Sequence, residues 1–98
     1  MENYQYLEVK RNSLFKNRYL YKAHIKASVL WRENKEVWNN EEDKEYMEDI
    51  HHFLTFRFPE EDFVIQGAVI YCNNLEVIFT IRLRYDEKLI KIEKAELK

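Results

Sequence analysis

The stretch that decides the fold is residues 39–59, NNEEDKEYMEDIHHFLTFRFP. Asn39 or Asn40 can cap a helix here, because an Asn side chain accepts a hydrogen bond from the first free backbone N–H groups. Three acidic residues follow, and carboxylates in a first turn complement the helix dipole. An apolar stripe then recurs at helical spacing through Tyr46, Met47, Ile50, Phe53 and Leu54. Pro59 ends the element, because the residue before a proline avoids helical angles. The stretch therefore predicts an acidic amphipathic helix.

Strands are predicted on the C-terminal side of this helix. Residues 63–72 are apolar on both faces, as in a central strand. Asn73-Asn74 is typical of a two-residue turn, since Asn tolerates the positive φ that such turns need. Residues 75–85 alternate between apolar and mostly polar side chains, which indicates a second strand. After a turn, residues 88–97 are interpreted as the last strand.

Strict alternation also marks the N-terminal side. The odd positions of residues 19–31 are all apolar, namely Tyr19, Tyr21, Ala23, Ile25, Ala27, Val29 and Trp31. This pattern favours a strand with one buried face. A helix over residues 14–31, capped by Ser13, stays open as the alternative because no Gly or Pro interrupts it. Residues 4–10 are predicted to form a shorter strand that precedes it.

Together these elements predict an α+β fold in the order β-β-α-β-β-β. The strands are expected to be antiparallel, because hairpin-length links cannot join parallel neighbours. One domain over residues 1–98 follows from the length, and the 46% hydrophobic and 15% aromatic content supports a core. We expect a mainly antiparallel sheet of about five strands, with the single acidic helix packed on it.

Composition and motifs argue against catalysis. One glycine, one proline and one cysteine leave no glycine-rich phosphate loop, no internal disulfide and no Cys-rich zinc site. Glu48 and His52 share a helix face, but two ligands do not make a metal site. No sequence motif supports Cys72 as a nucleophile with His24 or His52 as its base. A free Cys usually behaves as a small hydrophobe. We therefore expect no enzyme activity, no cofactor and no metal.

No export or membrane signal is recognised. The N-terminus lacks a basic region leading into an apolar stretch, as a secretory signal would have. No apolar run approaches the length of about 20 residues that spans a bilayer. A cytoplasmic location without membrane insertion is the expectation.

Charge is distributed unevenly along the chain. Residues 1–32 hold seven basic and two acidic side chains, whereas residues 33–62 hold three basic and eleven acidic ones. Each block could simply be a solvated face, and the pattern does not decide whether the blocks form contiguous poles. The sharper hypothesis is a small protein-binding module, such as an inhibitor or an adaptor. Viral proteins that block a host factor are one group of this type, and the comparison with them is an analogy. The module would bind its protein partner through the acidic side chains of Glu41, Glu42, Glu45, Glu48 and Asp49, since a charged band steers association.

Two alternative functions are kept. A basic sheet face could bind single-stranded nucleic acid through Lys22, Lys26, Arg82 and Arg84. This alternative is weakened because Tyr19 and Tyr21 have the opposite parity to the lysines and should face the core. A homodimer or larger homo-oligomer could form by edge pairing of the last strand, residues 88–97.

Overall fold

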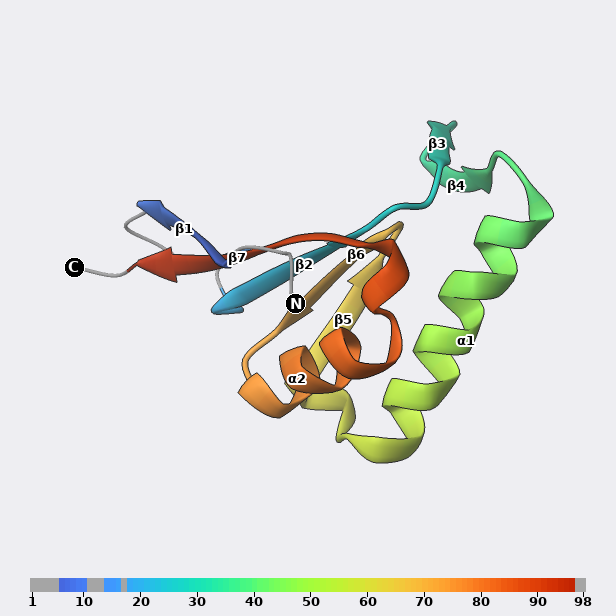
Figure 1. Ribbon diagram of the computed structural model, residues 1–98. Helices are drawn as coiled ribbons and strands as arrows, with labels where there is room; N and C mark the ends of the chain where they lie inside the picture. The colour runs from blue at the N-terminus through green and yellow to red at the C-terminus, as the bar shows by residue number, and fades with distance from the viewer. Residues whose placement is uncertain (1–5, 11–13, 17, 97–98) are drawn as a thin grey trace.

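The computed structural model describes residues 6–10, 14–16 and 18–96, arranged as Figure 1 shows. The two helices of this part of the chain are α1 (Glu41–Arg57) and α2 (Leu75–Arg84). One sheet has the spatial order β1-β7-β2-β6-β5, with bounds Tyr6–Lys10 for β1, Leu89–Glu96 for β7, Tyr21–Ile25 for β2, Val69–Cys72 for β6 and Phe63–Gln66 for β5. Strands β3 (Val29–Arg32) and β4 (Lys35–Trp38) form a separate hairpin, and η1 (Glu60–Asp62) and η2 (Asp86–Lys88) are short 3-10 helices.

The sheet is mainly antiparallel. Strands β7, β2, β6 and β5 pair antiparallel in that order, whereas β1 joins the other side of β7 in parallel, with Tyr6 opposite Ile92. The predicted α+β class with a sheet of about five strands is confirmed. The predicted order of elements is wrong, because the described chain runs β-β-β-β-α-β-β-α-β. Edge pairing through the last strand is also wrong, since β7 already has β1 and β2 as neighbours.

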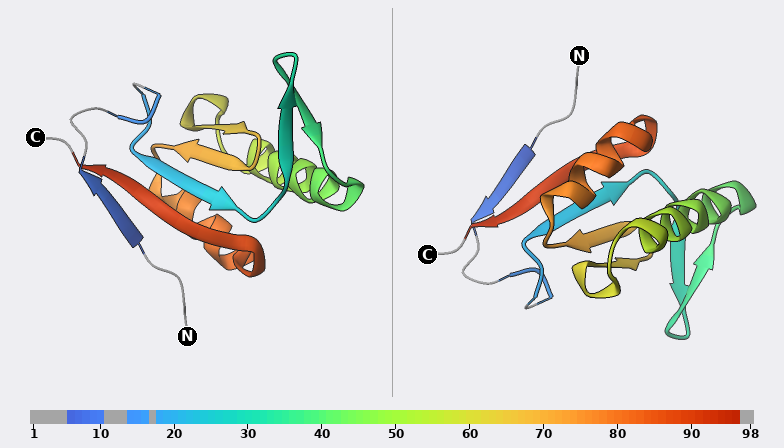
Figure 2. Two further views of the ribbon diagram at one scale, coloured as in Figure 1. Left: turned by 90° about the horizontal axis from the view of Figure 1, so that it is seen from above. Right: turned by 90° about the horizontal axis from the view of Figure 1, so that it is seen from below.

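Both helices pack on the same face of the sheet (Figure 2). The main core forms there from side chains of the sheet and the helices, among them Tyr21, Ala23 and Ile25 of β2, Met47, Ile50 and Leu54 of α1, and Val77, Ile78 and Ile81 of α2. The opposite face, which we call the open sheet face, carries a smaller cluster with Phe15, Tyr19 and Ala95 buried. The sheet therefore separates two surfaces of different character.

Helix α1 follows its sequence signals closely. Asn40 is the N-cap, and its side-chain oxygen accepts a hydrogen bond of 2.7 Å from the backbone N–H of Asp43. Met47, Ile50 and Leu54 are buried, as the helical spacing of the apolar residues in this segment predicted. The helix ends at Arg57, with Phe58 as an extended C-cap before Pro59. The prediction for this element is confirmed.

The predicted strand over residues 19–31 is only partly confirmed. Tyr21, Ala23 and Ile25 alternate with less buried side chains in β2, and the helical alternative is wrong. The strand ends at Ile25, where the register with β7 shifts and the chain turns away into the β3–β4 hairpin. As a result Trp31, expected on the buried face, is 57% exposed.

Residues 63–72 form a hairpin and not one continuous strand. Gly67 has a φ of +61°, which an L side chain would adopt only with strain, and the chain reverses there between β5 and β6. The expected turn at Asn73-Asn74 is wrong as well. Asn74 instead caps α2, because its side-chain oxygen accepts a hydrogen bond of 2.8 Å from the N–H of Glu76.

Residues 75–84 form a helix, so the predicted strand over 75–85 is wrong. The apolar set includes Ile78, which does not fit the alternation but lies beside Val77 and Ile81 on one helical face. These three side chains are fully buried against the sheet. Burial of that face stabilises the helical conformation over the strand that the alternation alone indicates.

Candidate functional site

Tyrosine contacts hold the two helices together. The Tyr85 hydroxyl, just after α2, donates a hydrogen bond of 2.9 Å to the Asp49 carboxylate of α1. The Tyr85 ring meets Tyr46 and Phe53 edge-on, at centroid distances of 5.7 and 6.2 Å. Burial raises the pKa of Tyr85, and it raises the pKa of Tyr46 to about 12. Both phenols are therefore neutral at physiological pH. Because these contacts hold α1 and α2 side by side, the solvent-facing sides of the two helices lie next to each other, and we call them together the outer helix surface.

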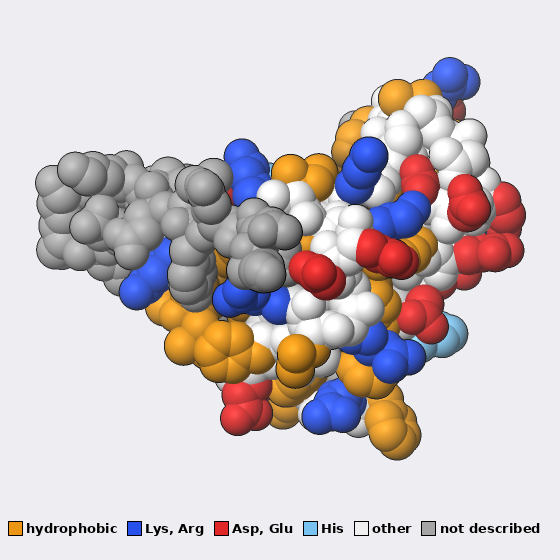
Figure 3. Space-filling model, viewed as in Figure 1, with side chains coloured by type: hydrophobic (Ala, Val, Ile, Leu, Met, Phe, Trp, Pro, Cys, Tyr) orange, Lys and Arg blue, Asp and Glu red, His pale blue; other side chains and the backbone are white. Residues whose placement is uncertain are grey.

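The acidic side chains predicted to bind a partner lie along α1, at one end of this surface. Glu41, Glu42, Glu45 and Glu48 are exposed, and no ion pair engages them within the described residues. We call these four glutamates the acidic band. Figure 3 shows acidic side chains gathered where α1 runs. The fifth predicted residue, Asp49, accepts the hydrogen bond from Tyr85 and so also joins the two helices.

Asp43 in the same stretch has a structural role. Its carboxylate accepts a hydrogen bond of 2.9 Å from the backbone N–H of Ser28, and Lys88 Nζ lies 3.7 Å away. The hydrogen bond from Ser28, with help from Asn40 and Lys88, lowers the pKa of Asp43 below its ordinary value. This carboxylate therefore ties the start of α1 to the segment after β2.

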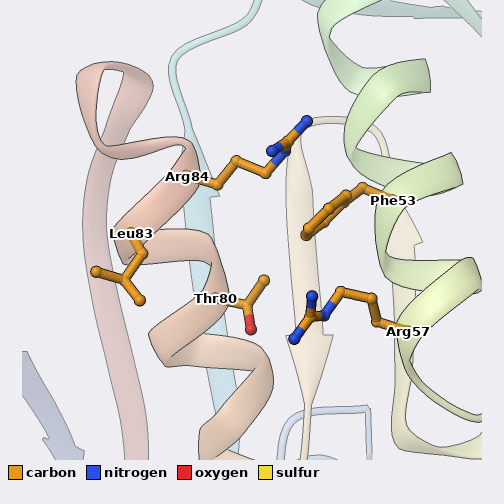
Figure 4. A pocket seen from close by; sticks show the side chains of 5 residues that line it. All are labelled: Phe53, Arg57, Thr80, Leu83 and Arg84. Carbon is orange, nitrogen blue, oxygen red and sulfur yellow. The ribbon is translucent and has the colours of Figure 1, made fainter.

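An arginine cleft opens between the two helices near the C-terminal ends of both. It has a volume of about 480 Å³ and is lined by Phe53, Arg57, Thr80, Leu83 and Arg84. Figure 4 shows Arg57 reaching in from α1 and Arg84 from α2, with the Phe53 ring between them. Their guanidinium carbons lie 5.5 and 4.1 Å from the ring centroid. Such stacking holds the two cations in place. Arg84 Nε also donates a hydrogen bond of 3.3 Å to the Tyr85 hydroxyl, and both arginine side chains stay exposed.

Large apolar side chains remain uncovered next to this cleft. On α2 they recur every fourth residue, at Leu75, Phe79 and Leu83, which are 41%, 51% and 87% exposed. We call these three residues the apolar stripe. Phe56 near the end of α1 is 90% exposed. The i, i+4, i+8 spacing of the stripe was present in the sequence, but it is visible only once the segment is known to be a helix.

The basic residues predicted to form one sheet face are not brought together. Lys22 and Lys26 belong to β2 and the link after it, whereas Arg82 and Arg84 lie on α2 across the sheet. The cause is the helical conformation of residues 75–84, which removes both arginines from the sheet. Arg84 instead contributes to the arginine cleft, together with Arg57, which the sequence reasoning did not select.

The open sheet face nevertheless combines lysines with aromatic rings. Lys22 Nζ lies 5.5 Å from the Phe15 ring centroid and 5.7 Å from that of Tyr71, and Lys16 Nζ lies 5.4 Å from Tyr71. Tyr19 belongs to the cluster on this face, so the expectation that it would face the main core is wrong, although Tyr21 does face it.

The histidines and the cysteine do not converge. His24 on the open sheet face lies 2.8 Å from Glu93. Although partial burial opposes ionisation, that hydrogen bond and the nearby cations hold the pKa of Glu93 below its ordinary value. Cys72 is fully buried on the other face, and burial raises the pKa of its thiol to about 12. His52 is exposed on α1. Within the described residues no three His, Cys, Asp or Glu side chains gather as metal ligands would.

Neither helix of the described chain combines the length and apolar character that crossing a membrane requires. Comparisons with protein-family models, curated proteins and solved structures found no match to this chain.

Proposed function

We propose that this chain is a small, non-catalytic protein-binding module that holds its partner on the outer helix surface. The observation that carries the proposal is the distribution of apolar side chains around α2. One side of this helix buries Val77, Ile78 and Ile81 in the core, and the other side is the apolar stripe. A helix that is apolar on both sides is normally covered on both sides.

The position of the stripe supports the same function. Exposed apolar residues are unremarkable when scattered, but contiguous patches with a polar rim mark interaction sites. Here the stripe shares Leu83 with the arginine cleft, and arginine is enriched at binding hot spots. The acidic band lies toward the opposite, N-terminal end of α1 and would steer a partner that carries basic groups. The apolar stripe and the arginine cleft thus adjoin each other, with a separate charged region further along α1.

An inhibitor or adaptor role fits such a surface on a small domain. The partner would be a protein, and binding would act by covering one of its surfaces. A cytoplasmic location belongs to the proposal, supported by the unpaired, buried Cys72.

Quantitative affinity capture from cells that express the tagged chain tests the proposal. Phe79→Glu and Leu83→Glu each place a charge on the apolar stripe, and Ile90→Glu is the matched control. Ile90 is 55% exposed, close to the 51% of Phe79, but it lies on β7 outside the outer helix surface. We expect a defined set of proteins to be lost from both stripe variants and retained by the control. Equal recovery from all three variants would contradict the proposal.

Single-stranded nucleic-acid binding on the open sheet face is the second candidate. The observation that favours it is the half-buried Tyr71 ring with Lys16 and Lys22 beside it, because stacking on an aromatic ring and phosphate contacts are the elements of such sites. A fluorescent oligothymidylate or oligouridylate, titrated with the protein, should bind with an affinity that falls as salt rises. Lys16→Ala and Lys22→Ala should each weaken it, whereas Lys35→Ala, on the separate β3–β4 hairpin, serves as control. Binding that is absent at low salt, or unaffected by these changes, would remove this candidate.

A further inference from the structure

The sheet ends at β5 with an open edge. Among the described strands β5 is outermost and has β6 as its one neighbour. Where this pairing begins, the Asn73 N–H donates a hydrogen bond of 3.1 Å to the Asp62 carbonyl. Bonded positions alternate along an antiparallel ladder, so Val64 also bonds to β6, and the N–H and C=O groups of Phe63 and Ile65 point to the open edge. These four groups have no hydrogen-bond partner among the described residues.

A hollow runs along this edge between β5 and α1, which lies on the β5 side of the sheet (Figure 2). Its larger part has a volume of about 560 Å³ and is lined, among others, by His51 and Thr55 of α1 and by Phe63, Val64 and Ile65 of β5. A smaller part of about 240 Å³ continues it, since both parts contain His51 and Ile65. Neighbouring residues of a strand point to opposite faces. A hollow lined by three consecutive residues of β5 therefore reaches the edge of the strand.

We propose that the β5 edge binds an extended peptide segment of a partner protein, which adds a strand to the sheet beside α1. The free backbone groups of Phe63 and Ile65 repeat at about 6.6 Å, the spacing of every second residue in a strand. Another polypeptide in the extended conformation matches that repeat with its own backbone. Its side chains on one face would enter the hollow. The site goes beyond the proposed function, because it shares no residue with the apolar stripe or the arginine cleft.

The side chains around the hollow define the chemistry of the peptide. Natural edge strands are usually blunted by charges or proline, but β5 has the sequence FVIQ and carries neither. Phe58 and Ile65 are half-buried in the wall of the hollow, so the peptide residues that face them should be apolar. The exposed carboxylates of Glu36, Glu48 and Glu60 outnumber the one lysine among the lining residues. Basic residues should therefore flank the apolar ones.

The same charges favour a peptide over a second copy of the chain. Pairing of β5 with β5 of another copy would bring two acidic rims together, and like charges that face each other across an interface oppose binding. A segment with basic flanks would instead complement Glu48 and Glu60, which line different parts of the hollow.

A displayed library of random ten-residue peptides, selected on the immobilised chain, provides the probe. The selected sequences should alternate apolar with polar residues and carry lysine or arginine at their ends. Ile65→Pro should raise the dissociation constant of a synthetic selected peptide by at least about tenfold. The reason is that proline removes the N–H at the open edge without removing a bond to β6. Ile65→Val keeps this N–H and is the matched control, which should bind like the unchanged chain.

Hydrogen exchange followed by NMR gives a readout that needs no substitution. The Ile65 amide should exchange readily in the free chain, and saturating peptide should slow its exchange by at least about tenfold. Circular dichroism verifies that the variants are folded. If Ile65→Pro unfolds, Thr55→Trp replaces it, because Thr55 is exposed on α1 and a larger side chain there would fill the hollow.

Three results would overturn the inference. The first is a library from which no peptide is enriched, and the second is a selected peptide that still binds the Ile65→Pro or Thr55→Trp variant as tightly as the unchanged chain. The third is protection of the Ile65 amide that rises with protein concentration in the absence of peptide, because a second copy would then cover the edge. Phe79→Glu separates this site from the proposed function, since it should retain the peptide. A peptide lost on Phe79→Glu alone refutes the β5 site, whereas failed protein capture with intact peptide binding refutes only the apolar stripe.

Discussion

Truncation of two neighbouring apolar residues, Ile81→Ala and Leu83→Ala, distinguishes the helix at residues 75–84 from a strand. In a strand the two side chains would point to the same face and be equally buried. In the helix Ile81 is 0% exposed and packs in the main core, whereas Leu83 is 87% exposed. The two substitutions should therefore differ greatly in their effect on the free energy of unfolding.

The size of the difference follows from burial. Cutting a buried Ile back to Ala costs about 2–5 kcal/mol, because apolar transfer is lost and a cavity remains. Surface substitutions usually stay within about 0.5 kcal/mol. With a urea dependence of about 1.5 kcal/mol per molar for a small protein, a cost of about 3 kcal/mol lowers the unfolding midpoint by about 2 M. Leu83→Ala should move the midpoint by no more than about 0.3 M.

Urea unfolding followed by circular dichroism and tryptophan fluorescence provides the measurement. Ile78→Ala is the control for a buried position and Phe79→Ala for an exposed one, since these residues are 1% and 51% exposed. The helix predicts that the four variants separate into pairs 78 with 81 and 79 with 83. Midpoint shifts of similar size for Ile81→Ala and Leu83→Ala would refute the argument.

Three further predictions use the same unfolding assay. Tyr46→Phe should leave the free energy of unfolding unchanged or raise it, because the buried Tyr46 hydroxyl has no hydrogen-bond partner among the described residues. Tyr85→Phe should lower it by about 1 kcal/mol, because the hydrogen bond to Asp49 is lost. A larger loss for Tyr46→Phe than for Tyr85→Phe would contradict this. Asn74→Ala should cost about 1 kcal/mol because it removes the N-cap of α2. Asn74→Ser keeps an accepting oxygen without placing a second carboxylate beside Asp62, and it should restore most of that loss. The thiol of Cys72 ionises near pH 9 when unfolded and near 12 when folded, so its contribution to stability is complete below pH 9 and is lost as the pH rises toward about 12. The alkaline fall of the urea midpoint should be smaller in Cys72→Ala, and an identical fall would count against burial as its cause.

Local signals predicted α1 but not α2. For α1, the cap at Asn40, the acidic first turn and the helical stripe agree with one another. For α2, the odd positions suit a strand, while Val77, Ile78 and Ile81 suit a helix, so periodicity alone is ambiguous. The helix is selected by long-range packing of Val77, Ile78 and Ile81 against the sheet. The alternation of apolar residues does not reveal which strands make up that sheet.

The parts of the candidate site likewise differ in whether local signals predict them. The acidic band was predictable because all four of its glutamates lie on α1, which the sequence predicts as a helix. The arginine cleft was not, because Arg57 and Arg84 meet on Phe53 only when α1 and α2 pack side by side. The apolar stripe was hidden by the interpretation of its segment as a strand. The prediction of one strand over residues 19–31 is wrong beyond Ile25 for a similar reason. The chain leaves the sheet there, but the apolar residues continue to alternate in the sequence.

The central place of β7 has a consequence for synthesis of the protein. Residues 89–96 are translated after all the other described elements, yet they lie between β1 and β2 in the sheet. Until that segment leaves the ribosome, β1 has no neighbour in the sheet and β2 keeps one side unpaired. The helices and the β5–β6 hairpin can form on the nascent chain, but the sheet closes only afterwards. Ribosome-bound chains that stop before residue 89 should therefore be digested readily by protease at β1 and β2, and release of the longer chain should bring protection in one step.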